Sequence, residues 1–394
     1  MSLDLPSLAP QIQSAGAKIA QEMAALGERL PQAVDALRAA SGLDAETLQA
    51  KLARAGDRWP GAIPTTDDLA NSIAPPALQT PLHVFGADGS QIPPDRHAAA
   101  MYYMINIGSL HYIAGSGQAP TARSTPSLYS GKEELYLEDG GLIGSEIVSA
   151  RRDIAEIAEL ARLANSCQGE ASLALLDNGL ILWLALQVQG QQRKSADALL
   201  KDYLHGMDNI RQAGAALAGV IDRPRHANVL ALLHLLDLPL DKIGTDRLQA
   251  TPYLGLTDRG LFAQVLPEGH RSVSFIYASP INRDFKAAGH EVAFFYYRPP
   301  GVKDPMRVEI PSWVADSPEL MARVHSGLVE QGLTTAGFPY VLARAHELAV
   351  VSQAERQTVA GLFEESLLAH GLHPERSHKQ TAKAWLTSRR RHSL

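Results

Sequence analysis

Cysteine is almost absent from this sequence of 394 residues, in which Cys167 stands alone. A disulfide bond within the chain is therefore impossible, and zinc sites built on cysteines are excluded for the same reason. A lone cysteine in a stretch of small residues is usually inert packing, and we interpret Cys167 in this way. Such cysteine usage is typical of the reducing cytoplasm, which is the location that we predict.

Long apolar runs and a basic leader segment are also missing. No uncharged apolar run reaches the length of about 18 residues that a membrane helix needs, so we expect no membrane association. The most apolar stretch, residues 171–188, contains Asp177 and Asn178 and suits a buried strand better than a bilayer. The first residues lack a basic segment followed by an apolar one, so we expect no secretory signal.

Positive charge is not in excess, because 36 lysines and arginines face 42 aspartates and glutamates, for a formal net charge of −6. This balance argues against a protein that coats nucleic acid through bulk charge. It does not exclude an enzyme that cuts nucleic acid, since such an enzyme concentrates carboxylates around metal ions. The sequence has neither a serine nucleophile elbow nor a glycine-rich phosphate loop with lysine, so ATP hydrolysis would have to come from another protein.

Two regions differ in their hydrophobic pattern. Over residues 1–79, apolar residues recur at helical spacing, and after Gly42 a second helix is expected over residues 45–55. From residue 80 onward, strands and helices alternate, which predicts a mixed α/β sheet with helices on its faces. We therefore predict an N-terminal helical region with a linker, residues 1–79, and a second domain, residues 80–394, which ends in a basic tail. The expected strands cover residues 82–87, 101–107, 110–114, 171–176, 272–277, 292–297 and 307–310, and the expected helices cover residues 144–164, 197–218, 227–235, 318–330, 340–348 and 353–371.

Acidic residues follow two of the expected strands. Asp88 comes directly after the strand over residues 82–87, and Gly89 next to it permits a turn with positive φ. Asp177 ends the apolar run of residues 173–176. Asp88 alone is more often part of an ordinary turn. A charged group at the end of so apolar a strand as residues 173–176 must be solvated, paired or bound to metal. Two strand-terminal carboxylates can nevertheless meet at one sheet edge, and carboxylates that share divalent ions are a recurring design for phosphodiester hydrolysis.

A helix carboxylate and a histidine are further candidates. Glu156 lies four residues after Arg152, and this spacing fits a solvated surface pair as well as a metal ligand. His346 follows Leu342 by one turn on an apolar helix and is expected to face inward, where a histidine is more often a satisfied core residue. If His346 joins the carboxylates, its imidazole favours Mn²⁺ over Mg²⁺.

As an ordered set, these segments resemble the NurA family of DNA-end-processing nucleases. The resemblance covers roughly residues 81–383, and it is specific as a set although each piece alone is weak. Asn178 follows Asp177 where the family more usually has glycine, which leaves the local turn open but not the carboxylate. The matching pieces are residues 83–92, 94–97, 102–108, 152–156, 175–180, 217–224, 257–262, 294–297, 307–315, 338–340 and 345–346, with Ser377 and Lys379 near the end.

The resemblance implies an RNase H-like core and a homodimer that encloses a narrow DNA channel. It implies Mn²⁺-dependent cleavage of single- and double-stranded DNA, as a 5′–3′ exonuclease and single-strand endonuclease. It further implies a partner, the hexameric ATPase and translocase HerA, with which the nuclease processes DNA ends. Two metal ions per site are expected, Mn²⁺ with Mg²⁺ as the alternative.

The resemblance also implies roles for individual residues, which are assigned by their positions in the matching segments. Asp88, Glu156, Asp177 and His346 are implied as catalytic metal ligands, and Tyr340 as their neighbour in the active site. Glu159 stays an alternative to Glu156, because one sequence does not determine the rotation of the helix.

Three basic residues, two of them near the end of the chain, are candidates for DNA contacts. Arg96, Lys379 and Lys383 are the predicted phosphate-backbone contacts, which carry little base specificity, and residues 389–394 are interpreted as a solvated tail. Two alternatives to a DNA nuclease remain. One is a non-catalytic NurA-like adaptor that docks on the translocase and guides DNA, although all four ligand residue types are present. The other is an RNase H-like enzyme that acts on RNA or hybrids.

Overall fold

The chain forms two compact units, and segments of the two units alternate along the sequence. The computed structural model describes residues 4–40, 42, 44–56, 59–96, 98, 100–137, 140–182 and 193–373. Unit 1 comprises Met1–Leu78, Asn178–Ile181 and Ala218–Pro339, and unit 2 comprises Gln79–Asp177, Leu182–Leu217 and Tyr340–Leu394. Unit 1 thus joins the predicted N-terminal region to a large part of the predicted second domain, and the two-domain division at residues 79 and 80 stays a prediction.

Unit 2 contains a mixed sheet with the strand order β6–β3–β4–β5. The strands β3 (Leu82–Ile92), β4 (Tyr103–Ala114) and β5 (Thr121–Tyr129) pair antiparallel in succession. The strand β6 (Ser172–Leu176) runs parallel to β3, with Ala87 opposite Leu176. This mixed sheet and its flanking helices confirm the predicted α/β fold class.

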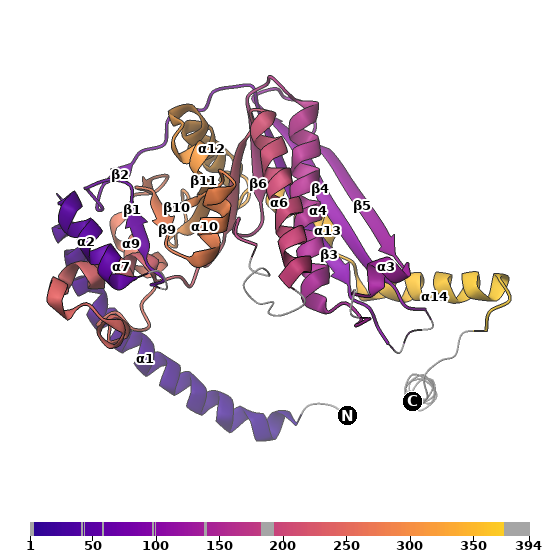
Figure 1. Cartoon of the computed structure of the whole chain (residues 1–394), viewed down its shortest axis with the longest axis horizontal. Helices are drawn as coiled ribbons and strands as arrows, with labels where there is room; N and C mark the ends of the chain where they lie inside the picture. The colour runs from indigo at the N-terminus through magenta and orange to yellow at the C-terminus, as the bar shows by residue number, and fades with distance from the viewer. Residues whose placement is uncertain are drawn as a thin grey trace. The chain divides into compact units, whose positions relative to one another are not determined.

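Helices lie on both faces of this sheet. On one face, α4 (Ser145–Ser166) packs against β3 and β4, and α6 (Arg193–Gln212) lies beside α4 (Figure 1). Ile157, Leu160 and Ala164 recur at helical spacing on the buried side of α4, as an amphipathic helix requires. On the other face, α13 (Tyr340–Ala349) packs against the same two strands. Two further helices belong to this unit, α3 (Lys132–Leu135) and α14 (Gln353–Ala369).

Two of the expected strands are one continuous strand. The sequence predicts separate strands over residues 101–107 and 110–114, joined at Gly108, but β4 runs without a break from Tyr103 to Ala114. Gly108 is needed for close packing instead of a turn, because a Cβ there would lie 2.2 Å from the carbonyl oxygen of Ala345 on α13. The strand β3 likewise continues past its expected end at residue 87. Asp88 lies in mid-strand opposite Gly108, so the turn expected at Gly89 is wrong.

Two other differences concern a strand and a helix end. The strand β5 was not expected, because its sequence is mostly polar and its residues are mostly exposed. The helix predicted over residues 197–218 ends at Gln212, and Ala216–Ile221 forms β7. Gly214, with φ of 76°, adopts the left-handed conformation that ends the helix.

Unit 1 combines helices with an antiparallel set of strands. The helices α1 (Leu5–Ala39) and α2 (Ala45–Ala55) agree with the prediction. The strands β1 (Ala62–Pro64), β9 (Phe275–Tyr277), β10 (Val292–Tyr297) and β11 (Met306–Pro311) pair in that order, and the end of β7 pairs with β11. The short strands β2 (Ser72–Ile73) and β8 (Arg271–Ser272) pair with each other, and β8 also pairs with β10. The remaining helices are α7 (Asn228–Asp237), η2 (Leu240–Lys242), α8 (Thr245–Gln249), α9 (Asp258–Val265), α10 (Pro280–Ala287), α11 (Ser312–Ala315) and α12 (Pro318–Gly332).

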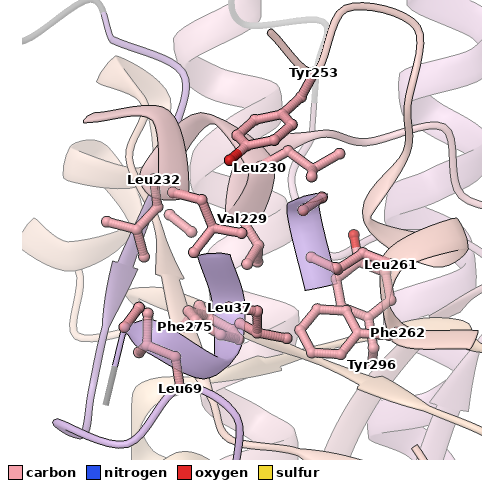
Figure 2. Close-up of a cluster of buried hydrophobic side chains, with 14 of the residues drawn as sticks. Leu37, Leu69, Val229, Leu230, Leu232, Tyr253, Leu261, Phe262, Phe275 and Tyr296 are labelled. Carbon is pink, nitrogen blue, oxygen red and sulfur yellow. The ribbon is translucent and has the colours of Figure 1, made fainter. Parts of the chain in front are cut away.

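An aromatic cluster forms the centre of the core of unit 1. The rings of Phe262 and Tyr296 stack with centroids 4.8 Å apart, and Phe275 lies tilted 6.3 Å from Phe262 (Figure 2). Leu37 brings α1 into this core, so α1 is held by tertiary packing at its C-terminal end. In the part of the chain that the structure describes, no helix is long and apolar enough to cross a membrane.

Candidate metal centre

Asp88, Asp177 and His346 converge in unit 2. The potential ligand atoms of these three side chains all lie within 4.8 Å of one another. His346 Nδ1 lies 2.7 Å from Asp88 Oδ2, although 258 positions separate the two residues. Two acidic side chains and one imidazole therefore share a small volume, as metal coordination requires.

The parallel pairing of β3 and β6 brings the two aspartates together. Ala87 lies opposite Leu176, and Asp88 and Asp177 are the next residues of their chain segments. Asp88 stays within β3, whereas Asp177 comes directly after β6. The expectation that the two carboxylates meet is therefore confirmed, although only Asp177 lies at a strand end.

Two glycines allow α13 to bring His346 to Asp88. A Cβ on Gly86 would lie 2.7 Å from the carbonyl oxygen of Val341, and one on Gly108 would lie 2.5 Å from the backbone nitrogen of Ala349. Real Cβ atoms do not approach backbone so closely, so larger residues at either position would push α13 away from the sheet. These glycines were not recognised from the sequence, because nothing local distinguishes a packing glycine from a turn glycine.

His346 does not face the core. Its neighbours Leu342 and Ala345 are buried, but the side chain of His346 is 62% exposed. The inward orientation expected from the helix pattern is therefore wrong. His346 is turned toward Asp88 at the surface of unit 2, where a solvent-borne ligand can reach it.

Glu156 lies beside this group on α4, and its side chain is buried. Among the described residues it is not one of the three whose ligand atoms converge. Its Oε1 lies 3.2 Å from Arg152 Nε in an ion pair, although Nε makes no hydrogen bond. Gly89 makes room for both side chains, because a Cβ there would lie 2.7 Å from Glu156 Oε1 and 2.6 Å from Arg152 Cγ.

The electrostatic surroundings of Glu156 disfavour its negative charge. Burial raises the pKa of Glu156 well above its usual value, and the charges of Asp153, Asp88 and Asp177 raise it further. The neighbouring Arg152 opposes this shift but does not cancel it. Burial and the neighbouring carboxylates thus outweigh Arg152 in disfavouring the ionised form of Glu156, and a bound cation would favour that form.

Glu159, the alternative to Glu156, is engaged elsewhere. Ser109 Oγ donates a hydrogen bond of 2.7 Å to Glu159 Oε1, and Arg162 Nε donates one of 2.7 Å to Oε2. Burial by itself would raise the pKa of Glu159, but these hydrogen bonds lower it below its usual value. The geometry therefore favours Glu156 over Glu159 as the acidic residue of α4 that interacts with the converging group.

Two of the remaining predicted site residues, Tyr340 and Arg96, lie in the part of the chain that the structure describes. Tyr340 begins α13, and its ring contacts Tyr112 edge to face at 6.1 Å. Tyr112 is four residues along β4 from Gly108, the partner of Asp88, which corresponds to about 14 Å of strand. Arg96 is exposed between β3 and β4, while Lys379 and Lys383 lie outside the described residues. The DNA contacts assigned to these basic residues stay predictions.

The chain is similar to known proteins in sequence and in fold. A family model described as the NurA domain matches residues 82–351, which is more than half of the chain. The crystal structure of the NurA nuclease from Sulfolobus solfataricus superposes with a TM-score of 0.53 at 14% sequence identity, covering 91% of this chain and 98% of that one. A crystal structure of NurA bound to dAMP and manganese gives a TM-score of 0.40 at 11% identity, covering 74% of this chain and 89% of that one. A comparison with curated protein sequences finds no match.

Proposed function

The chain belongs to the NurA family, and we propose that it is a metal-dependent nuclease that hydrolyses phosphodiester bonds of DNA at the group of Asp88, Asp177 and His346. The observation that carries the proposal is the convergence of two carboxylates and an imidazole, contributed by β3, the end of β6 and α13. This group is partly exposed, so an extended nucleic acid can reach it. Membership in a family of nucleases gives the group its expected chemistry.

The donor set fits a divalent metal ion. Carboxylate oxygens suit Mg²⁺ and Mn²⁺, and the imidazole of His346 shifts the preference toward Mn²⁺. Asp88, Asp177 and His346 would hold the ion, with Glu156 as the fourth protein group; the proposal includes a second ion. A divalent ion bound there would activate a water molecule and stabilise the charge that develops on the phosphate. The raised pKa of Glu156 supports this assignment, because burial and then the charge of Asp153 disfavour its ionised form, which a bound cation would stabilise.

The protein's own side chains have separable roles in the proposal. Asp88 accepts a hydrogen bond from the Gly89 backbone at 2.8 Å and lies against His346 Nδ1, so its carboxylate is oriented from two sides. Arg152 holds Glu156 and donates a hydrogen bond of 2.8 Å to Asp153, which positions the acidic residues of α4. A ligand set that is oriented before metal arrives loses less entropy on binding.

Finer points of the proposal rest on family membership. They are 5′–3′ exonuclease and single-strand endonuclease activity, a homodimer around DNA, and action on DNA ends together with a HerA-type hexameric ATPase. Arg96, Lys379 and Lys383 are proposed as phosphate contacts. Each of these points can be tested apart from the metal centre, by end-labelled substrates, by sedimentation, and by co-elution with the ATPase.

Cleavage of linear DNA by the purified full-length protein tests the central proposal. With Mn²⁺ the wild type should degrade the DNA, and with a chelator it should not. Asp88→Asn should abolish cleavage and leave thermal unfolding in the absence of metal almost unchanged, because the two side chains have the same shape. Cleavage by Asp88→Asn at the wild-type rate would overturn the assignment.

A matched pair of variants on α4 tests the choice of carboxylate. Glu156→Gln should lose cleavage, whereas Glu159→Gln, three residues further along the same helix, should retain most of it. The reverse result would move the proposed ligand to Glu159. A wild-type protein that neither binds Mn²⁺ nor cuts DNA would instead favour the adaptor, and preferential cleavage of matched RNA would favour a ribonuclease.

A further inference from the structure

A second group of potential metal ligands lies in unit 2, and we propose that it is a zinc site formed by His83, His111 and Cys167. Their ligand atoms all lie within 4.8 Å of one another, as they do in the candidate metal centre. His83 Nδ1 and His111 Nε2 are 3.0 Å apart. All three residues are partly buried, and Cys167 is a free thiol.

Three elements that are far apart in sequence build this group. His83 lies on β3 and His111 on β4, where Phe85 is the direct partner of His111, so the two histidines are diagonal neighbours with stacked rings. Both face α4, because Ser109, two residues before His111, donates its hydrogen bond to Glu159 of α4. Cys167 is the C-cap of α4, so the third potential ligand comes from the end of this helix.

The spacing of the two imidazole nitrogens is close to that of ligands around a tetrahedral ion, and the thiol lies within 4.8 Å of both ligand nitrogens. With zinc–nitrogen bonds of about 2.05 Å and zinc–sulfur bonds of about 2.3 Å, tetrahedral ligand atoms lie roughly 3.3 to 3.6 Å apart. The two imidazole nitrogens share a hydrogen bond of 3.0 Å, so metal binding would replace this hydrogen bond and separate the nitrogens by a few tenths of an ångström. Neutral imidazole is the form that binds metals and is the main form of an ordinary histidine at pH 7. A water molecule would complete four-coordination, since the cluster offers three protein ligands.

The two groups select different metals. Thiolate and imidazole are softer ligands than carboxylate, so His83, His111 and Cys167 favour Zn²⁺, whereas the aspartates and His346 favour Mn²⁺ or Mg²⁺. A mixed site needs one thiolate only, so the cysteine count excludes zinc sites built on several cysteines and not this one. Nothing in the local sequence signals the site, since its ligands are 28 and 56 positions apart.

The zinc site is separate from the candidate metal centre. His83 precedes Asp88 by five residues on β3, which is about 17 Å of extended strand. Cys167 follows Glu156 by 11 residues, which is about 16 Å along α4 and its cap. The ion would not take part in cleavage. It would link the end of α4 to β3 and β4 and so stabilise the helix that carries Glu156.

Cobalt is the probe for the experiment, because a thiolate bound to Co²⁺ gives a charge-transfer band in the near ultraviolet that carboxylates do not give. The full-length Asp88→Asn protein, reduced and freed of metal, should develop this band with one equivalent of Co²⁺ and lose it when Zn²⁺ is added. Cys167→Ser in the same background should lack the band. His83→Gln and His111→Gln should each weaken Co²⁺ binding by about 100-fold or more.

Two controls separate loss of the site from loss of the fold. Gln168→Ala changes the exposed residue that follows Cys167 and should leave the band intact, and circular dichroism should be the same for every variant. Zn²⁺ should raise the Tm of the wild type and not that of Cys167→Ser, because a ligand that binds only the native state stabilises it. No band in folded Asp88→Asn protein would overturn the proposal, as would a band that persists in both histidine variants. Neither result depends on DNA cleavage, so the proposed nuclease function is tested independently.

Discussion

Gly108→Ala is the variant that most directly tests how α13 is placed. The added Cβ would lie 2.2 Å from the carbonyl oxygen of Ala345 and 2.5 Å from the backbone nitrogen of Ala349. Ordinary van der Waals contact begins near 3.4 Å, so the helix backbone has to withdraw by about 1 Å. Backbone atoms cannot rotate out of the way as a flexible side chain can, and the whole of α13 must therefore shift or tilt.

The cost has two parts. Overpacking of this kind destabilises a protein by about 1 to 3 kcal/mol. The second part falls on activity, because His346 lies one residue after Ala345 on the displaced helix. A displacement of about 1 Å in a catalytic group can lower the rate by about 100-fold. We therefore expect a modest loss of stability and a large loss of Mn²⁺-dependent cleavage.

Denaturant unfolding without metal measures the loss of stability, and cleavage of linear DNA with Mn²⁺ measures the loss of activity. The control is Gly361→Ala on α14, where an added Cβ meets no atom within 4 Å and φ is not positive. Alanine in a helix is favoured over glycine by about 0.5 to 1 kcal/mol, so this control should be neutral or slightly stabilising.

Unchanged stability in Gly108→Ala would refute the close approach of α13 to β4. A protein that is destabilised but cuts DNA at the wild-type rate would refute the claim that this approach positions His346 for catalysis. Either outcome leaves the convergence of Asp88 with Asp177 to be tested by its own variants.

Three further variants probe charge and packing. Burial, followed by the charge of Asp153, raises the pKa of Glu156 in the native state, so the native state loses stability as pH rises through this raised pKa. Without metal, Glu156→Gln should therefore be more stable than the wild type at pH 8. Denaturant unfolding should show that this gain shrinks toward pH 4. Burial lowers the pKa of His325 to about 4, so its neutral form supports the fold above about pH 6.5 and that support is lost as pH falls toward 4. His325→Gln should remove up to about 3 kcal/mol of this pH dependence, and unfolding curves that stay parallel to the wild type would contradict it. Phe262→Ala should cost about 3 to 5 kcal/mol in denaturant unfolding, because its ring is buried against Tyr296, and a loss below 1 kcal/mol would contradict this packing.

Local signals in the sequence were sufficient for most helices and strands. Periodicity over a few residues reports which side of a segment is buried, so α1, α2, α4 and α13 were predicted close to their observed bounds. The strand β5 was missed because its side chains are mostly exposed and its apolar pattern is weak. The same local patterns, with the family resemblance, indicate Asp88, Asp177 and His346 as candidate metal ligands.

Tertiary structure decided what each of these residues contacts. Glu156 and Glu159 are three residues apart on one helix, and only the packing of α4 turns one toward the aspartates and the other toward Ser109. Gly89 and Gly108 resemble turn glycines in the sequence, yet they make room for α4 and α13. The sequence alone thus determined the family and most of the helices and strands, and it named candidate metal ligands. The rotation of each helix and the register of β3 against β4 depend on contacts between residues far apart in the chain. The same register brings His83 to His111. No local sequence pattern encodes such contacts.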